Sequence, residues 1–125
     1  MAANSFPMLV WITASFIALY GLLNAFAGLS QLRTRQIPSW SASGMLLAGL
    51  MLLATSILLL FSTTGSVWLF FILLLASLLA IHILTLYNGF YLHGRVKPAH
   101  HLLRLAISLT LLLLAYFARL SVSPP

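Results

Sequence analysis

The sequence contains no aspartate and no glutamate among its 125 residues. Carboxylates provide the acid/base pair of glycoside hydrolases, the acidic member of a Ser-His-Asp triad and the oxygen ligands of many metal ions. A membrane-embedded carboxylate also carries the proton in many coupled transporters. None of these mechanisms can be built from this polypeptide alone.

Cysteine is also missing, which excludes disulfides, thiolate nucleophiles and cysteine-ligated metal or iron–sulfur centres. The first ten residues, MAANSFPMLV, include no basic residue. A cleaved signal peptide begins with a basic region and has a shorter apolar core than the run found here, so we do not expect one.

Charged residues make up only 5% of the chain, whereas 62% is hydrophobic and the mean hydropathy is +1.13. A soluble domain of this size needs more polar surface, so the composition predicts an integral membrane protein. The six Lys and Arg residues give a formal charge of +6. In a membrane protein this charge indicates contact with anionic lipid headgroups and not with nucleic acid.

Four apolar stretches are each long enough to cross about 30 Å of hydrocarbon as a helix. They cover residues 8–29, 42–61, 67–88 and 101–120. The segments between them are short and rich in residues that form turns. The sequence therefore predicts an all-α protein with a single transmembrane domain over residues 1–125, folded as a compact up-down bundle of four helices.

Positive charge is concentrated in two of the connecting segments, residues 30–41 and 93–100, and is absent from the middle one, STTGS. The basic residues concerned are Arg33, Arg35, Arg95 and Lys97. Because cytoplasmic loops are enriched in Lys and Arg, we expect both segments to be cytoplasmic and both termini to lie outside. These side chains would then bind lipid headgroups on the cytoplasmic side of the membrane. Arg119, near the C-terminus, opposes this orientation. The expected location is a plasma membrane of the bacterial type.

The two basic segments have a similar layout. Asn24 is followed by a phenylalanine two residues later, a basic pair and Pro38, and Asn88 is followed by the same order ending at Pro98. Two parallel hairpin repeats related by an axis along the membrane normal would explain this similarity. Convergence is the alternative, because basic loops with a proline before a helix are common in membrane proteins.

Small residues form a stripe along the first apolar stretch. The members are Ala14, Ala18, Gly21, Ala25 and Gly28, and a shorter version in the second stretch consists of Gly44 and Ala48. Spacings of three and four place such residues on one helix face, where they let two backbones approach closely. The stripe predicts helix packing, with either a helix of the same chain or a second copy.

The last apolar stretch has a polar face, formed by His101, Arg104, Ser108, Ala115 and Arg119. Arg104 lies about one turn inside the predicted membrane boundary, where an unpaired charge is costly. The chain has no carboxylate to pair with it, so it either extends to the headgroups or finds another acceptor. The candidates are lipid phosphate, a free backbone carbonyl, neutral His82 or Asn88, an anionic ligand, and an acid on a partner protein.

His82 is the deepest histidine of the chain. Its structural interpretation is a hydrogen bond to a carbonyl or hydroxyl on a neighbouring helix, and its functional ones are a proton relay or a haem ligand. Haem would need a second histidine at the same depth, which the chain lacks. A metal site from His93, His100 and His101 is disfavoured because adjacent histidines on a helix point about 100° apart. We therefore expect no cofactor and no metal.

Three classes of function remain, and the sequence shows no complete set of catalytic residues for any of them. We expect a small non-enzymatic accessory, regulatory or protective component of a membrane complex, which binds anionic lipid or an acidic partner at its basic edge. One alternative is a small oligomeric transporter or channel for anions or anionic amphiphiles, which lacks the acid of cation-coupled exporters. The other is a lipid-acting enzyme. The ligand or partner contacts would be Asn24, His82, Asn88, His101 and Arg104. The expected partners are lipids, another membrane protein or further copies of the chain.

Overall fold

The computed structural model describes residues 2–61, 67–95 and 98–122, with the side chains of 2–7, 67 and 121–122 left aside. It consists of four helices, α1 (Ala2–Thr34), α2 (Ser39–Phe61), α3 (Val67–His93) and α4 (Pro98–Val122). Each is long and apolar enough to cross a membrane. The predicted all-α, four-helix transmembrane fold is therefore confirmed. The STTGS segment from 62 to 66 and Lys97 lie outside the described residues.

The helices extend beyond the apolar stretches that the sequence marks out, chiefly at the basic end. The first helix continues to Thr34, the third continues to His93, and the fourth begins at Pro98. An apolar stretch in the sequence marks only the part of a helix that lies in the hydrocarbon. A helix can continue into the headgroup region because its backbone hydrogen bonds are satisfied internally wherever it lies.

The helices α1 and α3 end in the same way, with one residue in the left-handed region. Arg35 has φ 57° and donates its N–H to the Gln31 carbonyl at 2.8 Å. Gly94 has φ 69° and donates to the Phe90 carbonyl at 2.8 Å. Such a bond satisfies one carbonyl at the helix end. Glycine takes this conformation without strain, whereas an arginine does not.

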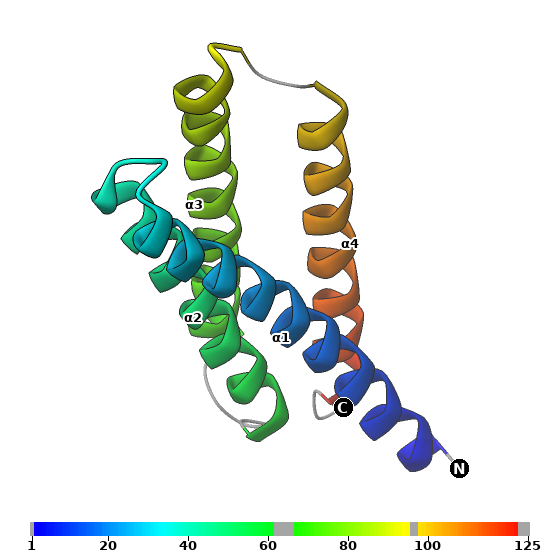
Figure 1. The fold of residues 1–125 in the computed structure, drawn as a ribbon. Helices are drawn as coiled ribbons and strands as arrows, with labels where there is room; N and C mark the ends of the chain where they lie inside the picture. The colour runs from blue at the N-terminus through cyan, green and yellow to red at the C-terminus, as the bar shows by residue number, and fades with distance from the viewer. Residues whose placement is uncertain (1, 62–66, 96–97, 123–125) are drawn as a thin grey trace.

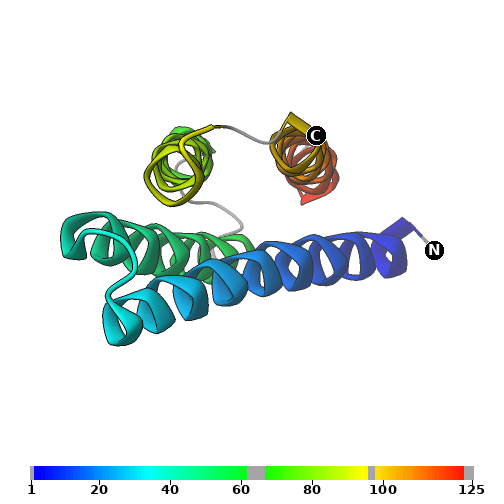
Figure 2. The ribbon, with the colours of Figure 1, turned by 45° about the horizontal axis from the view of Figure 1, so that its top comes forward.

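The four helices form two crossing hairpins. In Figure 1 the chain runs up and down, so that α1 begins and α4 ends at the same end of the molecule. Figure 2 shows α1 and α2 side by side in one layer, while α3 and α4 stand apart in a second layer and are seen more nearly end-on. We call α1–α2 the closed hairpin, because its helices lie side by side, and α3–α4 the open hairpin, because its helices stand apart. The two hairpins cross where they pack together.

Backbone contact between α1 and α2 closes the first hairpin. A methyl group added at Gly21 would lie 2.7 Å from the Gly49 carbonyl oxygen, and one added at Gly28 would lie 2.5 Å from the Leu46 nitrogen. Ala14, Ala25 and Ala48 are buried, and Ala18 is half-buried. The partner of the small-residue stripe is therefore a helix of the same chain.

Two glycines of α2 face different helices: Gly49 faces α1, and Gly44 faces α3. Gly49, which the sequence reading did not single out, supplies the closest approach from the α2 side. Gly44 faces α3, since an added methyl group would lie 3.0 Å from a Leu84 side-chain carbon. The helix α2 therefore packs small residues against both of its neighbours.

Large apolar side chains lie both inside and outside the bundle. Fully buried examples are Ile17, Leu52, Leu74 and Ile81, whereas exposed examples from the four helices are Leu22, Leu47, Ile72, Leu79 and Leu113. Exposing so many large side chains to water would cost about 25 cal/mol for each Å². Hydrocarbon is the medium in which this surface is stable.

The polar face of α4 points into the bundle. Ser108, Ala115 and Arg119 are buried along it, and the Arg119 guanidinium lies over the Phe70 ring at 5.9 Å from its centroid. The sequence placed Arg119 on this face and near the C-terminus. Its burial against an aromatic face explains how a basic residue is accommodated at the end away from the basic loops.

Candidate functional site

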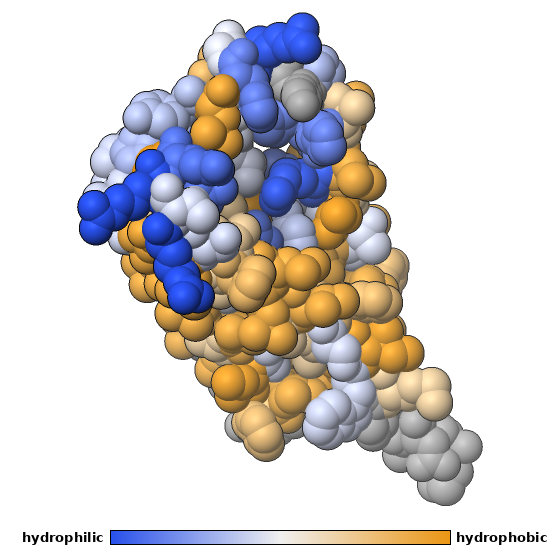
Figure 3. Space-filling view, viewed as in Figure 1, coloured by the Kyte–Doolittle hydropathy of each residue, from blue (hydrophilic) through white to orange (hydrophobic). Residues whose placement is uncertain are grey.

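Polar side chains gather at the end of the molecule where α1 meets α2 and α3 meets α4. In Figure 3 they cover the upper end, and a broad hydrophobic belt lies below them. Arg33, Arg35 and Arg95 are exposed there, as headgroup-binding residues must be. This end is the basic edge that the sequence predicts.

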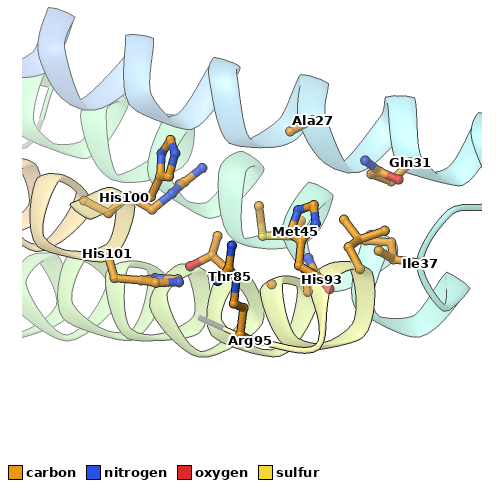
Figure 4. A pocket seen from close by; sticks show the side chains of 13 residues that line it. Ala27, Gln31, Ile37, Met45, Thr85, His93, Arg95, His100 and His101 are labelled. Carbon is orange, nitrogen blue, oxygen red and sulfur yellow. The ribbon is translucent and has the colours of Figure 1, made fainter. Parts of the chain in front are cut away.

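A cavity of about 300 Å³ opens within this polar end. Figure 4 shows its side chains arriving from all four helices, among them Gln31 from α1, Met45 from α2, Thr85 from α3 and His101 from α4. The polar and basic part of its lining is Gln31, Thr85, Asn88, His93, Arg95, His100, His101 and Arg104. We call this space the polar cavity.

Arg104 is half-buried and lines the polar cavity. Its Nη1 donates to the Asn24 Oδ1 at 3.4 Å, and this is the one hydrogen bond that it forms with the described residues. Asn24 is itself held in place, because its Nδ2 donates to the Tyr20 carbonyl at 2.7 Å. A guanidinium has five N–H donors, so a single long bond to a neutral amide leaves most of them for another acceptor.

His82 lies one helical turn below the polar cavity and joins α3 to α4. Its Nε2 is 2.8 Å from the Ser108 Oγ, with the donor set by the histidine tautomer. This contact matches the structural interpretation of His82 from the sequence, in which the histidine forms a hydrogen bond with a hydroxyl on a neighbouring helix. The sequence indicated Ser108 only as a member of the polar face of α4. Its position on the same face as Arg104 was the one signal that pointed to a part in the site.

Asn88 joins α3 to α2. The Ser41 hydroxyl donates to the Asn88 Oδ1 at 2.5 Å, and Ser41 is fully buried. The two asparagines of the predicted repeat thus play matching parts, since Asn24 accepts from α4 and Asn88 accepts from α2. The duplication itself stays a prediction. Ser41 gave no signal in the sequence, because a serine near a helix start usually caps that helix.

His101 forms the wall of the polar cavity opposite α3. Its Nδ1 is buried and has no hydrogen-bond partner among the described residues. Its Nε2 comes within 3.8 Å of the place where a side chain on Gly89 would begin. A methyl group at Gly89 would therefore fit beside the imidazole at an ordinary contact distance. The buried Nδ1 is a ring nitrogen whose hydrogen-bonding capacity is unsatisfied among the described residues.

The other two histidines at this end, His93 and His100, also line the polar cavity and are exposed. Within the described ranges, no three histidines come together closely enough to hold a metal ion. Of the described residues, Arg95 and Arg104 are the charged ones that line the cavity, and the whole chain contains no aspartate or glutamate to balance them. The polar cavity is therefore rich in donors and positive in charge, which suits an anion.

Comparison of the chain with models of known protein families, with curated proteins and with solved structures gives no match. The chemistry of the polar cavity is therefore what points to a function.

Proposed function

We propose that this protein is a non-enzymatic integral membrane component that binds an anionic group in the polar cavity at its basic end. The observation that carries the proposal is Arg104, a half-buried cation with one long hydrogen bond, at 3.4 Å, to a neutral amide. Charges within a membrane protein are normally paired, and this chain has no acid to pair with. A lipid phosphate or the carboxylate of a partner protein would complete the site through two parallel hydrogen bonds.

The lining of the cavity supports binding better than catalysis. Among the described residues, Thr85 contributes the one hydroxyl to this lining. Its single proton is already shared between the carbonyl oxygens of Ile81 and His82, which lie 2.8 and 3.0 Å from Oγ1. A nucleophilic hydroxyl needs a base beside it that can accept its proton. The arrangement favours a protein that holds an anion, as an accessory, regulatory or protective component of a membrane complex would.

We further propose that the polar cavity opens to the cytoplasm. The basic residues near its mouth, Arg33, Arg35 and Arg95, would then follow the positive-inside rule. A periplasmic reporter enzyme fused after Pro125 should be active outside the cell, and a fusion within residues 30–41 should be inactive. A cytoplasmic location of the C-terminus would overturn this orientation.

Anion binding is tested by the stability of the purified protein. In neutral detergent, adding phosphatidylglycerol or a peptide with a terminal carboxylate should raise the unfolding temperature, because a ligand at about 100 times its Kd stabilises by about 2.7 kcal/mol. Arg104→Gln should lose most of this shift, whereas Arg104→Lys should keep part of it because it retains the charge. Equal stabilisation of the wild type and the Arg104→Gln variant would contradict the proposal.

One observation favours transport as a second candidate function. The helices α3 and α4 stand apart. The His82–Ser108 hydrogen bond joins them below the polar cavity, and Arg119 lies over the Phe70 ring toward the other end. Helices that are so weakly joined could separate to pass an anion. Flux of a fluorescent anionic amphiphile across proteoliposomes, abolished by Arg104→Gln, would support transport. Binding without flux would leave binding as the function.

A further inference from the structure

A second hollow lies beside the polar cavity, between α1 and α4. It is an apolar groove of about 370 Å³. Its main lining residues are Phe16, Tyr20 and Leu23 from α1 and Ile107, Leu111 and Leu114 from α4. We call it the α1–α4 groove.

The groove has a closed floor and an open rim. Tyr20 and Leu111 are buried at 8% and 4% exposure, whereas Phe16 and Leu23 remain at least half exposed. The rim residues belong to the apolar surface that faces hydrocarbon. The groove therefore opens sideways into the membrane and can be entered by a lipid chain without contact with water.

The groove and the polar cavity meet at the hydrogen bond between Arg104 and Asn24. On α1, Leu23 lines the groove, Asn24 comes next, and Ala27 lines the polar cavity. On α4, Arg104 lines the polar cavity and Ala106 already lines the groove. The guanidinium thus stands at the boundary between a positive, donor-rich space and an apolar slot on the same two helices.

We propose that this junction is a binding site for one anionic phospholipid. Its phosphate accepts hydrogen bonds from Arg104 in the polar cavity, and one of its acyl chains lies in the α1–α4 groove. The inference rests on the proposed anion binding and names the ligand. An anionic lipid joins a phosphate and an apolar chain covalently, as a positive cavity beside an apolar groove requires. A free anion would leave the groove unused.

The energetics favour the same ligand. A lipid that is already in the bilayer gains little when its chain enters the groove, because the chain passes from one apolar medium to another. Selectivity between lipids must then come from the net charge of the headgroup, since a zwitterionic lipid has the same phosphate but adds a cationic group that the arginines of the polar cavity repel. The groove fixes where the chain lies and so holds the phosphate against Arg104.

The experiment compares lipids that differ in one part. The detergent-purified full chain is analysed by native mass spectrometry with dioleoyl phosphatidylglycerol, with dioleoyl phosphatidylcholine, and with glycerol 3-phosphate, which has a phosphate and no chain. Ala106→Phe fills the groove from an exposed position, and Ala76→Phe, an exposed position on α3 that lines neither hollow, is its matched control. Arg104→Gln removes the cation.

The wild type should retain one phosphatidylglycerol roughly tenfold to a hundredfold more strongly than phosphatidylcholine. Both lipids have the phosphate, but the quaternary ammonium of phosphatidylcholine cancels its charge beside Arg95 and Arg104, which line the cavity. Both Arg104→Gln and Ala106→Phe should lose this preference, and Ala76→Phe should keep it. If glycerol 3-phosphate binds as well as the lipid and Ala106→Phe has no effect, anion binding stands and the lipid site is overturned. If only an acidic membrane protein copurifies through Arg104, the lipid site is likewise overturned. If no anion binds, both proposals fail.

Discussion

The two hairpins of this protein have the same order of parts but opposite packing. Each consists of an ascending helix, a basic connection and a descending helix, which begins directly after Pro38 in α2 and at Pro98 in α4. In α1–α2 the backbones touch through Gly21, Gly28 and Gly49. In α3–α4 the helices stand apart, and His82 and Ser108 bridge the space between them. Because hydrophobic burial does not drive helices together in lipid, small residues at the contact decide which hairpin closes.

The difference assigns separate roles to the two hairpins. The closed hairpin supplies one rigid wall, and the open hairpin leaves room for the polar cavity and places Arg104 and His101 against it. Cavities in bundles are formed where facing helices fail to pack, so a site is expected in the open hairpin and not in the closed one. The protein thus combines a closely packed hairpin with an open one that leaves room for the polar cavity, the site of the proposed anion binding.

The largest effect should come from a methyl group placed in the closed hairpin. In Gly49→Ala the new carbon would lie 2.5 Å from the Ala25 nitrogen and 2.5 Å from the Gly21 carbonyl oxygen. Overpacking of this kind should lower the free energy of unfolding by about 3 kcal/mol. The measurement is unfolding in mixtures of neutral detergent and SDS, followed by circular dichroism.

The matched control for Gly49→Ala lies in the open hairpin. In Gly89→Ala the nearest neighbours of the new carbon are at 3.8 Å, an ordinary contact distance. Alanine is the better helix former, so stability should stay the same or rise by about 0.5–1 kcal/mol. Equal losses from the two substitutions would break the comparison between the closed and open hairpins.

An intermediate effect is expected from the contact that holds the open hairpin. A double-mutant cycle with His82→Ala and Ser108→Ala should show a coupling free energy of about 1 kcal/mol, because the hydrogen bond is lost in either variant. Thr110→Ala is the control, since its hydroxyl donates to the Ala106 carbonyl of its own helix. Additive effects for the Ser108 pair would mean that the bridge does not join α3 to α4.

An effect of similar size concerns how the two ascending helices end. Gly94→Ala should destabilise α3 by about 1 kcal/mol because alanine is strained at φ 69°. Arg35→Gly should stabilise α1 by a similar amount, and Arg35→Ala should not, since it removes the charge but leaves a side chain at positive φ. Thermal unfolding of the three variants in one detergent checks the prediction. Stabilisation by Arg35→Ala would instead assign the effect to charge.

Much of the candidate site followed from residue spacing. The steps of three, four and seven along α4 placed Arg104 and Ser108 on one face, and that face does point inward. The asparagines of the repeated layout also line or adjoin the polar cavity. The partners of these residues did not follow, because Ser41 and Asn88 lie 47 positions apart, and Asn24 and Arg104 lie 80 apart. Such pairs depend on the angle at which the hairpins cross.

The sequence by itself determined that this is a four-helix membrane protein with a basic end and with no acid to balance Arg104, since composition and the length of apolar runs are properties of the chain alone. It also placed the small residues on one face of α1. Only the tertiary structure decided that this face meets Gly49 of α2, that α3 and α4 stay apart, and that the polar cavity adjoins an apolar groove. These features arise from contacts between helices, whose crossing is set by packing over the whole bundle.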